Sequence, residues 1–232
     1  MKHLLRPALA AALLFGSATS LAAPCNPVNR LTCGLPFPSD YWSTEDASSP
    51  TGRRLAVGDD ILRDEVLAQL PAADGFTPAQ IFQDSTGFSA ASAVGFEFEG
   101  EISAATVFPY GSQLIKAWNL SRGEPVEIRS KRSDYAQSDS VSAPSTVLEV
   151  YPLDRWQYGD RMLVSVSMGA PVNNDDATVA SLCQRNTLGS NEQHYCDELT
   201  AALLSVGESP DNTRTATLFT VRDRAEVVGP MR

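Results

Sequence analysis

The chain has 232 residues, of which 43% are hydrophobic and 20% charged, and this composition is typical of a globular protein that buries a sizeable core. Its 28 acidic residues outnumber its 18 lysines and arginines. We therefore expect no nucleic acid and no anionic lipid as a partner, because both are bound through clusters of basic side chains.

Residues 1–22 have the pattern of a secretory signal peptide. Lys2 and Arg6 give a basic start, Leu4–Leu14 is a short apolar run, and Ser20–Ala22 offers small residues for cleavage. Cleavage would leave 210 residues (232 − 22) with a net charge of 16 − 28 = −12. We expect export to the periplasm, the outer surface or the medium, with no transmembrane segment in the mature chain; an uncleaved anchor is the alternative.

The four cysteines form two close pairs, Cys25 with Cys33 and Cys183 with Cys196. An even number of cysteines in an exported chain predicts disulfides, and local pairing is the simplest of the three connectivities. A zinc site is the alternative. The spacings disfavour it, because they lack a C-x-x-C pair and only His194 remains as a histidine after cleavage.

Residues 23–91 are predicted to form an irregular lead-in that wraps the rest of the domain. Pro24–Pro50 is rich in proline, serine, threonine and asparagine, and its prolines favour extended backbone. Asp59–Leu70 has apolar residues at helical spacing, and Pro71 marks the expected end of that helix.

Residues 92–222 are predicted to form an Ig-like antiparallel β-sandwich, so the fold is expected to be mainly β. The run Val94–Glu99 alternates apolar with polar residues, which places Glu97 and Glu99 on the solvated face of a strand. Turn residues separate further short runs of this kind. The other predicted strands are Gln113–Asn119, Val126–Ile128, Val147–Tyr151, Arg161–Ser167 and Thr215–Val221.

Two stretches interrupt the strand pattern. Ser130–Ser145 has no apolar period and is predicted to be a polar loop. Residues 176–206 have helical patterning and are predicted to form a small helical insertion before the last strand. Residues 223–232 form a tail without an assignable pattern.

Three short motifs lie in the first third of the chain: Leu35–Asp40 (L-P-F-P-S-D), Thr51 with Gly52, and Asp74–Pro78 (D-G-F-T-P). They resemble the N-terminal region of secreted bacterial lipases and esterases of the virulence-factor lipase type. In that family such segments precede a bacterial Ig-like module, to which residues 94–167 are similar. Met162 stands where related modules often carry a tyrosine.

The resemblance implies a role beside an enzyme rather than as one. In the family a hydrolase domain follows the Ig-like module, and this chain ends where that domain would begin. An α/β-hydrolase needs a G-x-S-x-G elbow, but Gly87–Ala91 and Gly189 with Ser190 both lack the second glycine. A catalytic triad also needs a histidine base, and His194 is interpreted as a surface or loop-packing residue.

Trp118, Trp156 and Tyr158 are the candidate ligand platform, for a sugar or an apolar ligand. The alternative is that these aromatic side chains pack the core. No cofactor is predicted. Calcium is the one candidate ion, at Asn173–Asp176, although this turn lacks the D-x-D-x-D-G spacing.

The sequence therefore leads to three hypotheses. The first is a non-catalytic, exported Ig-like accessory module of a lipase-type protein, with a hydrolase domain as its partner. The second is a free-standing module that binds or adheres to a cell surface or polymer. The third is a hydrolase with a non-standard site.

Overall fold

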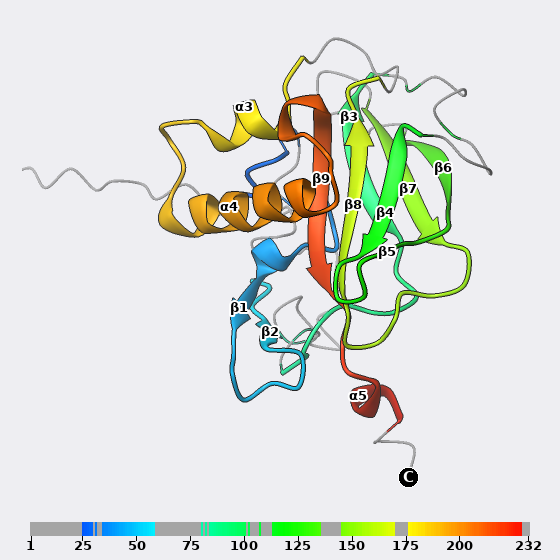
Figure 1. The fold of residues 1–232 in the computed structure, drawn as a ribbon, viewed down its shortest axis with the longest axis vertical. Helices are drawn as coiled ribbons and strands as arrows, with labels where there is room; N and C mark the ends of the chain where they lie inside the picture. Colours follow the sequence, from blue (N-terminus) through cyan, green and yellow to red (C-terminus); the bar gives the residue numbers. More distant parts are fainter. Residues whose placement is uncertain are drawn as a thin grey trace, which may run out of the picture.

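The computed structural model describes residues 25–29, 31, 34–58, 80, 82, 84–100, 102, 107, 113–135, 145–169 and 176–228 (Figure 1). The predicted signal peptide, the predicted helix at 59–70, the D-G-F-T-P motif and most of the predicted calcium turn lie outside the described residues. The fold is mainly β, as predicted.

Two antiparallel sheets form the body of the protein. Each sheet contains one pairing between strands that are not consecutive along the chain, β3 with β7 in the first and β4 with β8 in the second, so the strand order does not follow the chain. The first sheet has the order β3 (Val94–Glu99), β7 (Ser145–Pro152), β6 (Ile128–Tyr135). The second has the order β5 (Glu124–Pro125), β4 (Ile115–Asn119), β8 (Arg161–Ser167), β9 (Thr213–Thr220).

The two sheets share one hydrophobic core, which confirms the predicted sandwich. In β3 the burial alternates along the strand, because every second side chain points to the partner sheet. The same cluster joins inward side chains of both sheets. From the first sheet these are Val94, Phe96, Phe98, Leu148 and Val150, and from the second Ile115, Ala117, Met162, Val164, Val166 and Phe219.

Strand β8 is buried on both faces, because helices cover the outer face of the second sheet (Figure 1). Met162 and Val164 face the sandwich core, whereas Leu163 belongs to a second core with the helices. These helices are α3 (Val179–Cys183) and α4 (Ser190–Ser205), followed by the short η4 (Pro210–Asn212). The predicted helical insertion before the last strand is thus confirmed.

A disulfide ties the two helices of the insertion together. Cys183 and Cys196 are bonded, with their Cα atoms 5.4 Å apart. This confirms the second predicted pair. Cys25 is also disulfide-bonded, while its expected partner Cys33 lies outside the described residues. Disulfide bonding of this kind fits a protein that matures in an oxidising compartment.

The lead-in docks on the sandwich through short backbone contacts. Phe37 and Gly95 exchange two backbone hydrogen bonds, at 3.2 and 2.8 Å, so the lead-in covers part of the open edge of β3. Beyond this bridge the chain forms η1 (Asp40–Trp42) and an antiparallel hairpin of β1 (Ser43–Glu45) and β2 (Arg53–Leu55). Gly52, in the turn before β2, has a φ of +75°, which glycine adopts without strain.

The prediction of a loop over Ser130–Ser145 is wrong in its first part. Strand β6 continues to Tyr135 and pairs with β7 over its whole length. The strand is held by backbone bonds and by polar contacts across it. Lys131 Nζ lies 3.0 Å from a Glu149 carboxylate oxygen, and Ser133 donates to the same group at 2.6 Å. A polar edge strand of this kind carries no hydrophobic alternation to reveal it.

The tail, for which the sequence predicts no structure, contains the short helix α5 (Arg224–Val228). Its Glu226 accepts a hydrogen bond from the backbone of Thr86 at 2.9 Å. In the part of the chain that the model covers, no helix has the length and apolar character needed to cross a membrane.

Gly87 tests the seam between the lead-in and the end of β9. A Cβ at this position would lie 2.6 Å from the backbone nitrogen of Arg222 and from the backbone oxygen of Thr220. Because neither atom can move alone, we expect Gly87→Ala to lower the free energy of unfolding by about 2–3 kcal/mol, as overpacking does. Urea denaturation measures this. Gly95→Ala is the control: its nearest contact is an ordinary 3.5 Å to Leu35 Cδ2, and a loss as large as that of Gly87→Ala would contradict the account.

Candidate functional site

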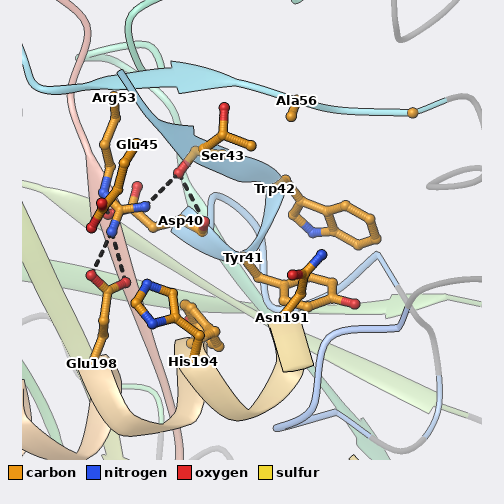
Figure 2. A pocket seen from close by; sticks show the side chains of 13 residues that line it. Asp40, Tyr41, Trp42, Ser43, Glu45, Arg53, Ala56, Asn191, His194 and Glu198 are labelled. Carbon is orange, nitrogen blue, oxygen red and sulfur yellow. Dashed lines mark hydrogen bonds and ion pairs between the residues drawn. The ribbon is translucent and has the colours of Figure 1, made fainter. Parts of the chain in front are cut away.

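A buried ionic network joins the lead-in to the sandwich and to α4 (Figure 2). The Asp40 side chain is completely buried, and its Oδ2 lies 3.4 Å from Arg53 Nε and 3.1 Å from Arg161 Nε. Both guanidinium groups also bind Glu198: Arg53 Nη2 contacts its two oxygens at 2.6 and 2.7 Å, and Arg161 Nη2 contacts one at 3.0 Å. Two carboxylates thus face two guanidinium groups, and the network carries no net charge.

Asp40 also accepts hydrogen bonds from β9. The backbone N–H of Thr220 donates to Oδ1 at 2.8 Å, and its hydroxyl donates to Oδ2 at 3.0 Å. Burial raises the pKa of the Asp40 carboxyl, while Arg53, Arg161 and the Thr220 bonds act in the opposite direction. The contacts therefore offset part of the desolvation that burial imposes on the carboxylate.

The residues before Asp40 are seated in the same way. The Thr217 hydroxyl donates to the carbonyl of Pro38 at 2.6 Å, and the Ser39 hydroxyl donates to the Tyr195 hydroxyl at 2.9 Å. Tyr195 is buried, and this burial raises the pKa of its phenol. The last three residues of the L-P-F-P-S-D motif, Pro38–Asp40, therefore contact β9 and α4 through polar bonds, while Phe37 pairs with β3.

Beside the network lies a pocket of about 490 Å³ between the lead-in hairpin and α4 (Figure 2). Its walls combine aromatic and charged side chains from both elements. The indole of Trp42 is almost fully buried, and its Nε1 has no hydrogen-bond partner among the described residues. A buried donor without a partner is uncommon in folded proteins. The side chains that line the pocket include Tyr41, Glu45, Arg53, Asn191, His194 and Glu198.

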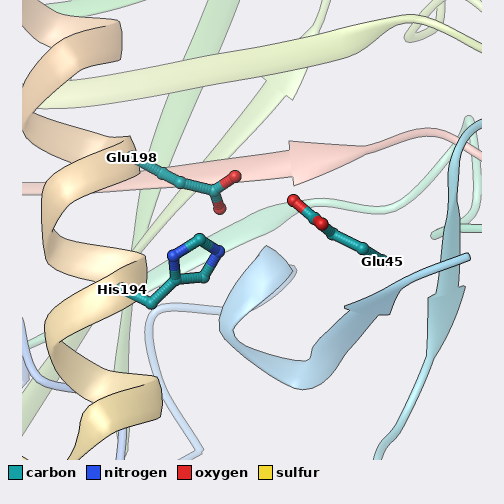
Figure 3. Close-up of side chains that lie close together, drawn as sticks. All are labelled: Glu45, His194 and Glu198. Carbon is teal, nitrogen blue, oxygen red and sulfur yellow. The ribbon is translucent and has the colours of Figure 1, made fainter.

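Three metal-ligating side chains gather in this pocket (Figure 3). Glu45 comes from β1, and His194 and Glu198 come from α4, where their i, i+4 spacing places them on one face. One ligand atom from each lies within 4.8 Å of the others. Glu45 and His194 are exposed, and Glu198 is half-buried.

The three aromatic residues predicted as a ligand platform do not form one exposed surface. Trp156 is completely buried, stacks edge-to-face on Phe219 at 5.4 Å, and donates its indole N–H to the carbonyl of Ser92 at 2.8 Å. Trp118 is half-buried against the helix-side core, whereas Tyr158 is half-buried against the sandwich core. Trp156 therefore packs in the core, which was the alternative prediction for these residues.

Other predicted residues are placed as follows. Glu99 is exposed and Glu97 is half-buried on the outer face of β3. His194 lies on the exposed face of a regular helix rather than in a loop, although it stands between the two bonded cysteines. The pocket residues Trp42, Glu45 and Glu198 were not predicted from sequence. The i, i+4 spacing of His194 and Glu198 was the available signal, but nothing in the sequence links α4 to Glu45.

No family model matches the sequence, and neither a curated protein nor a solved structure matches the chain. The resemblance to the lipase-type N-terminal region therefore stays a prediction that rests on the short motifs.

Asp40 provides a test of the buried network. In Asp40→Asn the two guanidinium groups lose one of their two carboxylate partners, so we expect the free energy of unfolding to fall by about 3 kcal/mol. Asp84→Asn is the matched control, because the Asp84 side chain is 79% exposed and its ion pair with Arg54 is long, at 3.6 Å. Its effect should stay within about 0.5 kcal/mol. Equal effects of the two variants in urea denaturation would contradict the network's role.

Proposed function

We propose that the chain is an exported, non-catalytic accessory module with an Ig-like sandwich, of the kind that accompanies the hydrolase domain of secreted lipases and esterases. Its role would be to support, anchor or present such a domain. One observation carries the proposal: the residues of the motif that resembles that family are the residues that attach the lead-in to the sandwich.

The contacts of this motif support a scaffold role. Phe37 bridges to β3, the carbonyl of Pro38 accepts from β9, and Asp40 holds the charged network. If other members of that family share these residues, their structural role in attaching the lead-in would be enough to explain them. Binding a substrate would not be needed to explain them.

The packing of the second sheet points the same way. Both of its faces are covered, one by the first sheet and the other by α3 and α4. Two hydrophobic cores and a disulfide between α3 and α4 suit a rigid support. Its interaction surfaces would then lie on loops and on the lead-in.

A free-standing binding module is the second candidate, and the pocket beside α4 favours it. Its volume of about 490 Å³ falls within the range of about 300–1,000 Å³ that small-ligand sites occupy. The charged and polar side chains that line it, Glu45, Arg53 and His194 among them, would orient a polar ligand.

Ester hydrolysis tests the non-catalytic part of the proposal. We expect the purified protein to hydrolyse p-nitrophenyl esters at the rate of the buffer alone. His194→Ala, which removes the base candidate, should give the same trace. Hydrolysis well above the buffer rate that is lost in His194→Ala would overturn the proposal in favour of a non-standard hydrolase.

The accessory role is tested separately, at the level of the gene. We expect the open reading frame, or an adjacent one, to encode a domain with G-x-S-x-G. If the frame stops after Arg232 and no hydrolase is encoded beside it, the binding module becomes the better explanation.

A further inference from the structure

We propose that Glu45, His194 and Glu198 form a binding site for a divalent transition-metal ion of the zinc class. The site lies in the pocket between the lead-in hairpin and α4. This inference does not depend on the accessory role, because either a scaffold or a binding module can hold such an ion.

The geometry is close to that of a bound ion. With zinc–ligand bonds of about 2.0–2.1 Å, ligand atoms in a tetrahedral site are separated by about 3.3 Å. The ligand atoms of the three residues already lie within 4.8 Å of one another. Closing the remaining distance requires only small rotations of Glu45 and His194, and both side chains are exposed and free to make them.

The donor atoms are available. Neither the carboxylate of Glu45 nor the imidazole of His194 makes a hydrogen bond or ion pair with any described residue. Glu198 is engaged, but its Oε1 accepts only one bond, from Arg53, and keeps a lone pair for an ion.

Arg53 and Arg161 act on Glu198 as positioning residues. They hold its carboxylate from the side of the buried network, at 2.6 to 3.0 Å, while its other side faces the pocket. Hydrogen bonds behind a ligand fix its orientation in many metal sites. Glu198 would then be the fixed ligand, and the side chains of Glu45 and His194 would rotate to reach the ion.

Charge favours an ion at this place. The carboxylates of Asp40 and Glu198 are balanced by Arg53 and Arg161. Glu45 stands across the hairpin from Arg53 but makes no ion pair with it or with any other described residue. A divalent cation bound by Glu45 and by the imidazole of His194 would balance the charge of Glu45. One nitrogen and two carboxylate ligands suit zinc or nickel better than calcium or magnesium, which take oxygen ligands alone.

Bound metal would have two consequences. It would connect β1 to α4 on the outer side of the buried network and so add a second link between the lead-in and the helices. Three protein ligands would also leave a coordination position open toward the pocket, where a carboxylate or other anionic group could bind the ion.

Zinc titration by calorimetry tests the proposal, on protein purified without a polyhistidine tag. We expect one Zn²⁺ per chain. Loss of outer-shell partners already costs about 10–100-fold in metal affinity, so His194→Ala and Glu45→Gln should each weaken binding by at least about tenfold. Glu127→Gln is the matched control, because Glu127 is an exposed glutamate away from this pocket, and its affinity should equal that of the wild type.

Thermal unfolding supplies the second readout. Because Zn²⁺ would bind only the folded site, it should raise the Tm of the wild type and of Glu127→Gln, and should not raise that of His194→Ala. Both ligand variants change exposed side chains, and circular dichroism without metal checks that they fold. The proposal is overturned if no binding is measured up to millimolar Zn²⁺, or if the ion binds equally well to both ligand variants.

Discussion

A completely buried carboxylate, Asp40, is the constraint on which the rest of the structure depends. It receives two guanidinium groups and two hydrogen bonds from β9, and those contacts come from three separate parts of the chain. Burying an unpaired carboxylate costs several kcal/mol, so η1 can occupy its place only when β2, β8 and β9 are all in position. We infer that the network specifies how the lead-in is aligned, more than it adds to the total stability.

That alignment creates the pocket. Because Arg53 reaches past Asp40 to Glu198, strand β2 and its partner β1 are held opposite α4, with Glu45 facing His194 and Glu198 (Figures 2 and 3). The Cys183–Cys196 disulfide fixes the other wall, since Cys196 lies two residues after His194. The scaffold and the proposed metal site thus depend on the same charged contacts, although their functions are separate.

The sequence predicted the sandwich because its central strands bury one face and alternate in hydrophobicity, as Val94–Glu99 does. It predicted the helical insertion because Leu199 and Leu203 recur at helical spacing. It did not predict β6 beyond Ser130, where cross-strand polar contacts replace apolar alternation. The candidate site was missed for a different reason. Glu45 and Arg53 are partners in the β1–β2 hairpin, but Glu198 of α4 joins them only through tertiary packing, and local pattern carries no information about which distant charges face one another.

The most direct test of the alignment role is a double-mutant cycle between the lead-in and the sandwich. It compares Asp40→Asn, Arg161→Gln and the double variant by urea denaturation, with the free energy of unfolding as the measured quantity. Contacting charges in one network couple by about 0.5–3 kcal/mol, and we predict at least about 1 kcal/mol here. Additive effects of the two substitutions, with no coupling between them, would contradict the claim that this contact holds the lead-in to the sandwich.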